Sequence, residues 1–190
     1  MTNHLIDKII CDKYQVPLYM IKDENTISFR LVFNILNPNY DLENMMGLNL
    51  ISLIGTLNPD VVESLVVDDF DSTTTNINST MVLAHFGQEL GISQKYIYSN
   101  ITMHKENNQV VFNSIQRCKP ESIVMPKKID PVLNSNSILI IKLNSSHEAI
   151  IQYDFDLKLE NDIPVFMEKM PGLLMKKIFI RLKLFLEGLT

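Results

Sequence analysis

Apolar and polar residues alternate along much of this chain with a period of two. Residues 26–36 show the pattern most clearly, because every second side chain there is apolar: Ile27, Phe29, Leu31, Phe33 and Ile35. Such alternation is typical of a strand that buries one face. Strand-like patterns also occur at residues 16–21, 61–70, 73–86, 94–103, 109–118, 137–143 and 149–159, where we expect further strands. Because no helix separates most of them, we expect an antiparallel sheet and not a parallel sheet of βαβ units.

Helical spacing appears in three other segments. Residues 3–14 and 41–54 carry apolar side chains at intervals of three and four, and Gly55 is expected to end the second helix. Residues 163–189 form a long, strongly apolar segment directly after the last predicted strand. An antiparallel sheet with its few helices gathered on one side indicates the α+β class.

The terminal helix has its own expected start and bend. Asp162 is expected to cap it, and Pro164 then lies in the first turn, where a missing N–H is harmless. A kink is expected at Pro171 and Gly172, because proline removes a backbone hydrogen bond and glycine weakens the turn. A kinked helix of this kind is able to open.

Composition limits the class of protein. The chain has 190 residues, of which 46% are hydrophobic and 21% charged, so residues 1–190 are expected to form one globular domain. A net charge of −5 argues against a nucleic-acid partner. Charged residues interrupt the terminal helix, so a membrane span is not expected. Two cysteines, Cys11 and Cys118, and no recognisable signal peptide indicate a cytoplasmic, reducing setting.

Motifs for catalysis or for cofactors are not found. The four histidines are too scattered to give metal-ligand spacing, and the chain has no glycine-rich phosphate loop. Cys118 lacks a local partner that would make it a nucleophile. We therefore expect no catalytic residue, no metal site and no cofactor, and a protein that is not an enzyme.

Four stretches carry a resemblance to a known family. They are LNPDVVESLVVDDFD at 57–71, SQKYI at 93–97, QVVFNSI at 109–115 and YDFDLKLENDIP at 153–164. In order and spacing they resemble the START lipid-transfer domains, although Leu57 stands where the family has tryptophan. The resemblance implies a helix-grip fold, in which a curved antiparallel sheet wraps around a long C-terminal helix. Polyketide cyclases and pollen-allergen-like proteins have related folds and remain alternatives.

The resemblance also implies an internal cavity for a lipid or similar hydrophobic ligand, for transfer between membranes or for sensing. The residues expected to bind the ligand are Phe29, Leu31, Phe33, Met81, Leu83, His85, Asn113, Ile151, Tyr153 and Phe155 from the sheet, and Phe166, Met170, Leu174 and Ile178 from the terminal helix. Three of these, His85, Asn113 and Tyr153, are the polar candidates for specificity. A lid is expected at Gly87, Leu90 and Gly91, since two glycines around an apolar residue suit a movable cover.

Other interpretations of these features remain open. Lys169, Lys176 and Lys183 are seven residues apart and form either a solvated edge of a core helix or a basic face that contacts an anionic membrane transiently. The domain is alternatively an enzyme of the cyclase or hydratase type, which needs several polar residues in its cavity. It is alternatively an interaction module whose cavity has collapsed. The sequence specifies neither the ligand nor the oligomeric state.

Overall fold

A computed structural model describes residues 8–23, 26–71, 73–125, 129–133, 135–158 and 168–190. The strands are β1 (Lys8–Cys11), β2 (Leu18–Asp23), β3 (Thr26–Leu36), β4 (Val62–Val67), β5 (Asn76–Leu83), β6 (Lys95–Glu106), β7 (Gln109–Gln116), β8 (Asp130–Pro131), β9 (Asn136–Ser145) and β10 (Glu148–Lys158). The helices are the 3₁₀ turns η1 (Leu42–Met45) and η2 (Gln88–Leu90) and the α-helices α1 (Asn49–Leu57) and α2 (Met170–Glu187).

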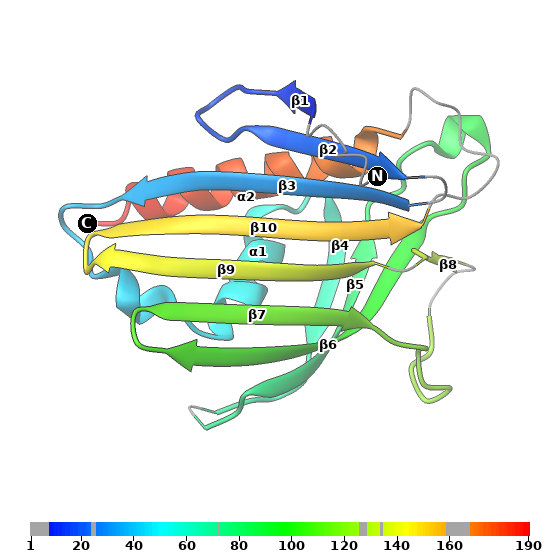
Figure 1. Cartoon of the computed structure of the whole chain (residues 1–190). Helices are drawn as coiled ribbons and strands as arrows, with labels where there is room; N and C mark the ends of the chain where they lie inside the picture. Colours follow the sequence, from blue (N-terminus) through cyan, green and yellow to red (C-terminus); the bar gives the residue numbers. More distant parts are fainter. Residues whose placement is uncertain (1–7, 24–25, 72, 126–128, 134, 159–167) are drawn as a thin grey trace, which may run out of the picture.

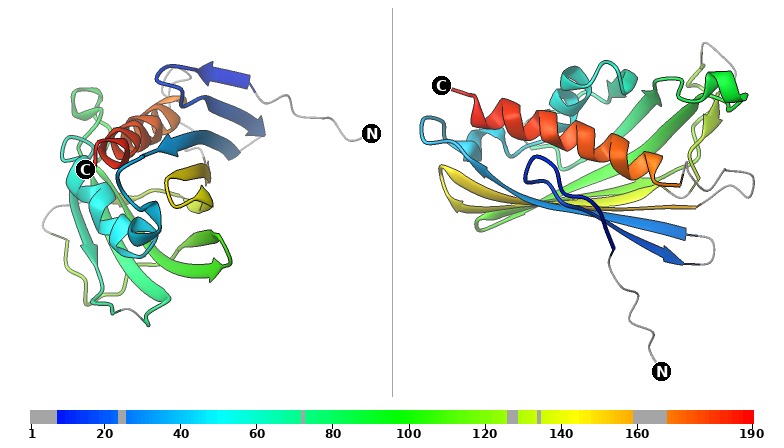
Figure 2. Two further views of the ribbon diagram at one scale, coloured as in Figure 1. Left: turned by 90° about the vertical axis from the view of Figure 1, so that its left-hand side faces the viewer. Right: turned by 90° about the horizontal axis from the view of Figure 1, so that it is seen from above.

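The strands form one sheet in the order β1-β2-β3-β10-β9-β7-β6-β5-β4 (Figure 1). All neighbours along this path are antiparallel, and the short β8 adds a parallel pairing to β6. The sheet curls, and α2 lies along its concave side with α1 beside it (Figure 2). This arrangement confirms the predicted α+β class and the helix-grip fold.

The core lies between α2 and the alternating apolar positions of the central strands. On β3 the residues Ile27, Phe29, Leu31, Phe33 and Ile35 are all buried, as the alternation predicts. On β10 the register places Phe155 opposite Phe29 and Ile151 opposite Phe33. From α2 the core receives Ile178, Phe179, Leu182 and Leu186. Burial of this apolar surface, at about 25 cal/mol per Å², is the main force that holds α2 on the sheet.

The predicted N-terminal helix was wrong where the structure describes it. Lys8–Cys11 is an edge strand that pairs antiparallel with β2. Tyr14 and Gln15 take positive φ in the intervening turn, at 63° and 55°. The β-branched Ile9 and Ile10 satisfy helical spacing locally, but the free edge of β2 supplies hydrogen-bond partners that an isolated short helix lacks.

The predicted helix at 41–54 is split and displaced. Leu42–Met45 is a 3₁₀ turn and α1 begins only at Asn49. Gly55 does not end the helix, which runs to Leu57 and is closed by Asn58, whose Nδ2 donates to the carbonyl of Ile54 at 2.9 Å. Gly55 serves packing instead, since a Cβ there would lie 2.8 Å from the Leu65 Cδ2 atom of β4.

The expected kink in the terminal helix was also wrong. Pro171 lies in the first turn of α2, where its missing N–H breaks no helical bond. Gly172 is required for a close contact, because a Cβ on it would lie 2.4 Å from the ring of Phe29. The expected cap Asp162, Pro164 and the ligand-binding candidate Phe166 lie outside the described residues. Across the described part of the chain, no helix is long and apolar enough to cross a membrane.

One member of the predicted lysine stripe is buried. Lys176 is only 3% exposed, and its Nζ donates to the carbonyl oxygen of Cys11 at 3.2 Å. Lys169, by contrast, is exposed, and Lys183 pairs with Glu187. The stripe is therefore neither a continuous solvated edge nor a continuous basic face, because the β1 region covers its middle.

Candidate functional site

A small pocket lies beneath α2 and has a volume of about 120 Å³. Side chains of the sheet, of α1 and of α2 enclose it. The described residues that line it are Ile51, Ile54, Ser79, Met81, Ile97, Ser99, Ile101, Phe112, Ser114, Ser135, Asn136, Ser137, Leu139, Tyr153, Phe155, Met175, Ile178 and Phe179. We call this the inner pocket. None of these residues carries a charge.

A second pocket of about 400 Å³ adjoins it at the first turn of α2. The described lining residues are Val61, Leu83, Ala84, Phe86, Gly91, Ile92, Ser93, Gln94, Lys95, Ile97, Val132, Leu133, Ser135, Phe155, Leu157, Lys158, Met170, Pro171, Leu174 and Met175. We call this the mouth pocket. The two pockets share Ile97, Ser135, Phe155 and Met175, so they meet at these four side chains.

Three aromatic rings form one wall of the inner pocket. The ring centroids of Tyr153 and Phe179 are 4.6 Å apart, and those of Tyr153 and Phe155 are 5.5 Å apart. Phe155 in turn stacks on Phe29 at 4.9 Å. These contacts tie α2 to the central strands β3 and β10 and give the pocket a rigid apolar side.

Serine hydroxyls occupy the other strands of the pocket floor. Ser79 and Ser99 lie opposite each other on β5 and β6, with their oxygens 3.1 Å apart. Ser114 lies opposite Ser137 in the pairing of β7 with β9. Ser137 also hydrogen-bonds the side chain of Tyr153, and burial raises the pKa of that phenol. The described lining is thus apolar except for uncharged hydroxyls and the amide of Asn136.

Ser135 stands out among these serines. Its Oγ is buried and, within the described part of the chain, has no hydrogen-bond partner. Its backbone is fixed, because its N–H donates to Gln116 Oε1 at 2.7 Å. Gln116 also donates from its backbone N–H to Asn136 Oδ1 at 3.1 Å and from Nε2 to the carbonyl of Val132. Gln116 therefore holds Ser135 at the junction of the two pockets.

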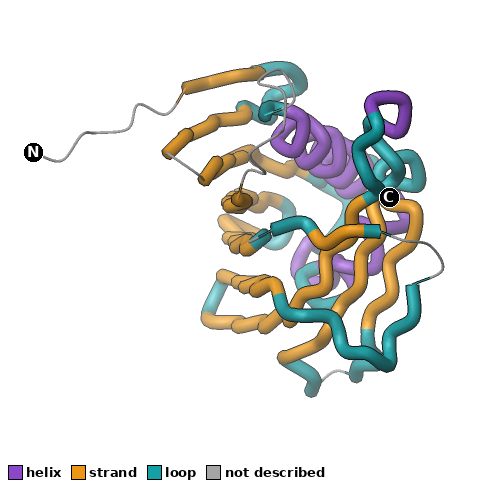
Figure 3. The backbone as a smooth tube through the Cα atoms, turned by 90° about the vertical axis from the view of Figure 1, so that its right-hand side faces the viewer, coloured by secondary structure: helices purple, strands orange, loops and turns teal. Residues whose placement is uncertain are grey.

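The predicted lid loop connects β5 to β6 (Figure 3). Its residues Gly91 and Ile92 border the mouth pocket. Gly87 and Gly91 flank η2 with φ of 84° and 72°, a conformation that glycine adopts without strain. The N–H of Ile92 donates to the carbonyl of Gly87 at 3.1 Å, which closes the loop on itself. Gly91 and Ile92 line the mouth, whereas the side chain of Leu90 lies outside what the structure describes. Whether the loop moves stays a prediction.

The structure divides the predicted ligand-binding residues into groups. Those that line a pocket are Met81, Leu83, Tyr153, Phe155, Met170, Leu174 and Ile178. Four others, Phe29, Leu31, Phe33 and Ile151, are buried in the surrounding core and line neither pocket. On β3, Phe29 packs closely against Gly172 of α2, and the ring of Phe33 meets that of Phe179 edge to face at 6.1 Å.

Two of the polar candidates lie elsewhere. His85 is exposed after the end of β5, and its Nε2 lies 2.7 Å from the carbonyl of Ile92. Asn113 alternates with Phe112 and Ser114, which line the inner pocket, so it lies on the outer face of β7. The inference from alternation failed for His85 because the strand ends before it. Only Tyr153 is where a polar specificity residue was expected.

The serines were missed. A usable signal existed, because each lies on the apolar face of its strand: Ser79 between Ile77 and Met81, and Ser99 between Ile97 and Ile101. A hydroxyl at an otherwise buried position needs a partner, which marks it for attention. Their convergence from four strands depends on pairing between distant segments and is not visible in any one of them.

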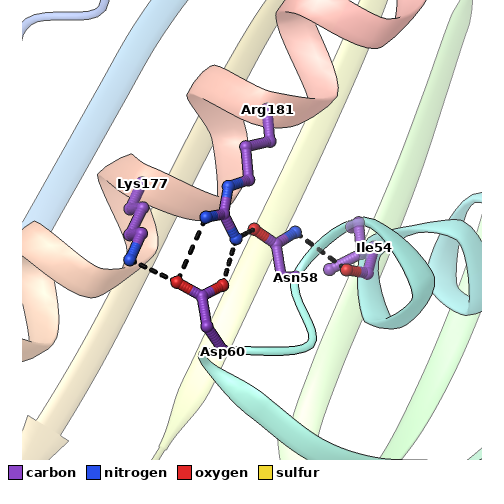
Figure 4. A network of polar contacts seen from close by, with 5 residues as sticks. All are labelled: Ile54, Asn58, Asp60, Lys177 and Arg181. Atoms are coloured by element: carbon purple, nitrogen blue, oxygen red, sulfur yellow. Dashed lines mark hydrogen bonds and ion pairs between the residues drawn. The ribbon is translucent and has the colours of Figure 1, made fainter.

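Polar contacts hold the middle of α2 against the segment between α1 and β4 (Figure 4). Asp60 accepts hydrogen bonds from Arg181, one of them 3.1 Å from Nη2, and from Lys177 at 2.5 Å. Arg181 Nη1 also lies 3.3 Å from Asn58 Oδ1, which links α2 to the end of α1. The bonds from Arg181 and Lys177 hold the pKa of the Asp60 carboxyl well below its usual range, and Asp60 raises the pKa of Arg181.

Solved structures similar to this chain share its fold. The lipid transfer and protein localization domain of human StarD13 (DLC2) matches 97% of this chain and 90% of its own, with a TM-score of 0.73 at 13% identity. A STAR-related lipid transfer protein fragment from Xanthomonas axonopodis matches 95% of this chain and 98% of its own, with a TM-score of 0.71 at 10% identity. Human StAR-related lipid transfer protein 5 matches 93% and 84%, with a TM-score of 0.69 at 12% identity.

No family model and no curated protein matches the sequence of this chain. At these identities the structural matches establish the fold, and the chain has the fold of START domains.

Proposed function

We propose that this chain binds a lipid or similar hydrophobic molecule in the inner and mouth pockets, as a carrier or a sensor. The observation that carries the proposal is the pair of adjoining, mostly apolar pockets beneath the N-terminal half of α2. The names of the similar structures, two human and one bacterial, each refer to lipid transfer. On this proposal residues 1–190 act as one lipid-binding domain.

The two pocket volumes suit this use only when taken together. At about 120 Å³ the inner pocket is smaller than the ~300–1,000 Å³ of typical ligand sites, whereas the mouth pocket, at about 400 Å³, falls in that range. A lipid would extend from one into the other past Met175 and Phe155. Transfer of its apolar surface out of water, at about 25 cal/mol per Å², supplies the affinity.

The pocket lining favours binding over catalysis. Among the described residues of the inner pocket there is no histidine, carboxylate or lysine. Tyr153 is the one titratable group of that described lining, and its raised pKa keeps it protonated at neutral pH. A cyclase or hydratase needs an acid and a base near its substrate. The space beneath α2 likewise argues against a collapsed cavity.

Exchange of the ligand requires an approach to a membrane. The mouth pocket carries Lys95 and Lys158 on its lining, and the exposed Lys169 and the 39% exposed Leu173 lie at the same end of α2. Basic and apolar groups together favour transient contact with an anionic membrane surface. We place this contact at the mouth pocket, on the cytoplasmic side.

The test is to block the space without unfolding the protein. Met175 lines both pockets, so Met175→Trp is expected to fill the junction. The control is Leu184→Trp on the same helix, because Leu184 is 59% exposed and a larger side chain there extends into solvent. Native mass spectrometry after purification from a lipid-containing lysate should find bound lipid in the wild type and in L184W. M175W should lose at least about tenfold in lipid occupancy.

Circular dichroism serves as the folding control for both variants. The proposal fails if the wild type neither retains lipid nor binds any of a panel of phospholipids, fatty acids and neutral lipids. It also fails if a folded M175W binds lipid as the wild type does. Vesicle-to-vesicle transfer with and without anionic lipid then separates a carrier from a sensor.

A further inference from the structure

We infer that the inner pocket, next to its junction with the mouth pocket, receives an uncharged oxygen group of the ligand, a hydroxyl or a carbonyl, through Ser135 at the junction together with Ser137 and Tyr153. This inference rests on the proposed function and names the chemistry of the ligand's inner end. The ligand would enter with its oxygen-bearing end first. Its apolar remainder would then lie in the mouth pocket.

The first argument is the absence of charge. No described residue of the inner pocket is charged, whereas the lysines Lys95 and Lys158 belong to the mouth pocket. An ionised group placed among these serines would lose its hydration without gaining a counter-charge. Hydroxyls suffice for a neutral oxygen. The inner end of the ligand is therefore uncharged.

The second argument is the state of Ser135. Its buried Oγ has no hydrogen-bond partner within the described chain, although buried polar groups are nearly always satisfied. Gln116 fixes the backbone of Ser135, so the hydroxyl changes its position only by rotation about χ1. A ligand oxygen at the junction would supply the missing bond. An unsatisfied buried hydroxyl lowers the stability of the empty protein. A ligand oxygen that hydrogen-bonds this hydroxyl would account for its presence at a buried position.

The third argument is the neighbouring pair. Ser137 hydrogen-bonds Tyr153, and the raised pKa of the buried phenol means that Tyr153 keeps its proton. Ser137 and Tyr153 line the same pocket as Ser135, and their mutual hydrogen bond leaves one of the two O–H groups free to donate to a ligand. Hydroxyls both donate and accept, so they serve a ligand hydroxyl and a ligand carbonyl alike.

The opposite orientation makes a different prediction. A fatty-acid anion would keep its carboxylate at the mouth, near Lys95 and Lys158, and place its methyl end among the serines. That arrangement leaves Ser135 unsatisfied. It would make binding depend on the lysines and not on the serines.

Four ligands with the same sixteen-carbon chain separate these cases: 1-hexadecanol, 2-hexadecanone, hexadecane and hexadecanoate. Isothermal titration with ligand delivered from cyclodextrin gives the four dissociation constants. The dissociation constants of the alcohol and the ketone should be lower than those of hexadecane and hexadecanoate by about tenfold or more. Ser135→Ala should weaken the alcohol and ketone about tenfold and leave hexadecane unchanged.

A matched control and a second readout guard against a merely structural effect. Ser122→Ala changes an exposed serine and should alter none of the four constants. Ser135→Ala should leave the thermal stability of the empty protein equal to or above that of the wild type, because it removes an unsatisfied buried hydroxyl. A serine with a structural role would instead lower it.

The outcomes are distinct. Equal binding of hexadecanol and hexadecane, or binding of hexadecanol that Ser135→Ala does not weaken, overturns the inference while the proposed function survives. Tightest binding of hexadecanoate, lost in Lys95→Gln and Lys158→Gln, establishes the opposite orientation. If none of the four binds and no lipid co-purifies, the proposed function itself fails.

Discussion

The two halves of α2 differ in how they are attached. The C-terminal half is held by polar contacts: Asn37 Nδ2 donates to the carbonyls of Leu186 at 2.7 Å and Leu189 at 2.8 Å, and Lys183 donates to the carbonyl of Asn34 at 2.6 Å. The N-terminal half has Met170, Leu174 and Met175 over the mouth pocket. Lys22 pairs with Glu168 just before the helix, and the other polar contacts of this half come at its far end, where Lys176 donates to the carbonyl of Cys11 and Lys177 pairs with Asp60.

This difference indicates that the two halves of α2 have different roles, one in stability and the other in forming the pockets. The C-terminal half fixes the helix on the sheet through buried side chains and satisfied carbonyls. The N-terminal half offers apolar side chains to a space that the protein's own atoms do not fill. A ligand would complete the packing there, so we expect binding to depend on the first half and unfolding to depend on the second.

The largest expected effect comes from the buried core of the C-terminal half. Leu182→Ala should lower the free energy of unfolding by about 2–5 kcal/mol, because Leu182 is 0% exposed and its removal leaves a cavity. Leu174→Ala, in the half-buried mouth, should cost less stability and weaken ligand binding more. Urea denaturation and lipid titration measure the two effects. Leu184→Ala is the control, and equal stability losses at positions 174 and 182 would contradict the comparison.

The next effect tests the contact of the N-terminal half with β3. Gly172→Ala should cost about 1–3 kcal/mol, because the added Cβ meets the Phe29 ring at 2.4 Å. Phe29→Leu makes room for that methyl group. The double variant should therefore lose less stability than the sum of the two single variants in a double-mutant cycle by chemical denaturation. If the two stability losses were additive, the contact between Gly172 and Phe29 would not determine how closely α2 approaches β3.

A smaller effect tests the polar anchor at the C-terminal end. Asn37 is 1% exposed, so Asn37→Ala removes a buried donor from two helix carbonyls and should cost about 1–2 kcal/mol. Amide hydrogen exchange should rise in the last turn of α2 and stay unchanged at its first turn. Asn39→Ala, at an exposed neighbouring asparagine, is the control. Faster exchange along the whole helix would show that its halves are not independent.

The smallest effect is pH-dependent and concerns Asp60. Folding lowers the pKa of Asp60 from its ordinary value of 3.8. The stabilisation that Asp60 contributes is therefore complete above pH 3.8, and it is lost as the pH falls from there through the lower pKa of the folded state. Asp60→Asn should thus show a slightly lower melting temperature than the wild type from pH 7 to about pH 5. The difference should shrink below the ordinary carboxyl pKa, and added salt should reduce it at neutral pH. A difference that grows on acidification would contradict this account.

Much of the fold followed from the sequence, because the alternation on β3 and β10 is strong and local. Strand β3 spans residues 26–36 as expected, and its buried face is the predicted one. The site was less predictable. Tyr153, Phe155, Met170 and Leu174 meet at the pockets, yet Phe29 and Phe33 do not, since the close approach of α2 at Gly172 fills the space above β3.

The sequence by itself determined the period of each segment, and with it which side chains share a face. Tertiary structure decided what lies against that face. Lys176 is at a polar position by spacing, but β1 covers it, and β1 is a strand because β2 offers an edge. Ser135 is unremarkable in its own segment and becomes a buried hydroxyl only where Gln116 and the two pockets meet. Periodicity is a property of neighbours along the chain, whereas burial depends on residues that folding brings from far away.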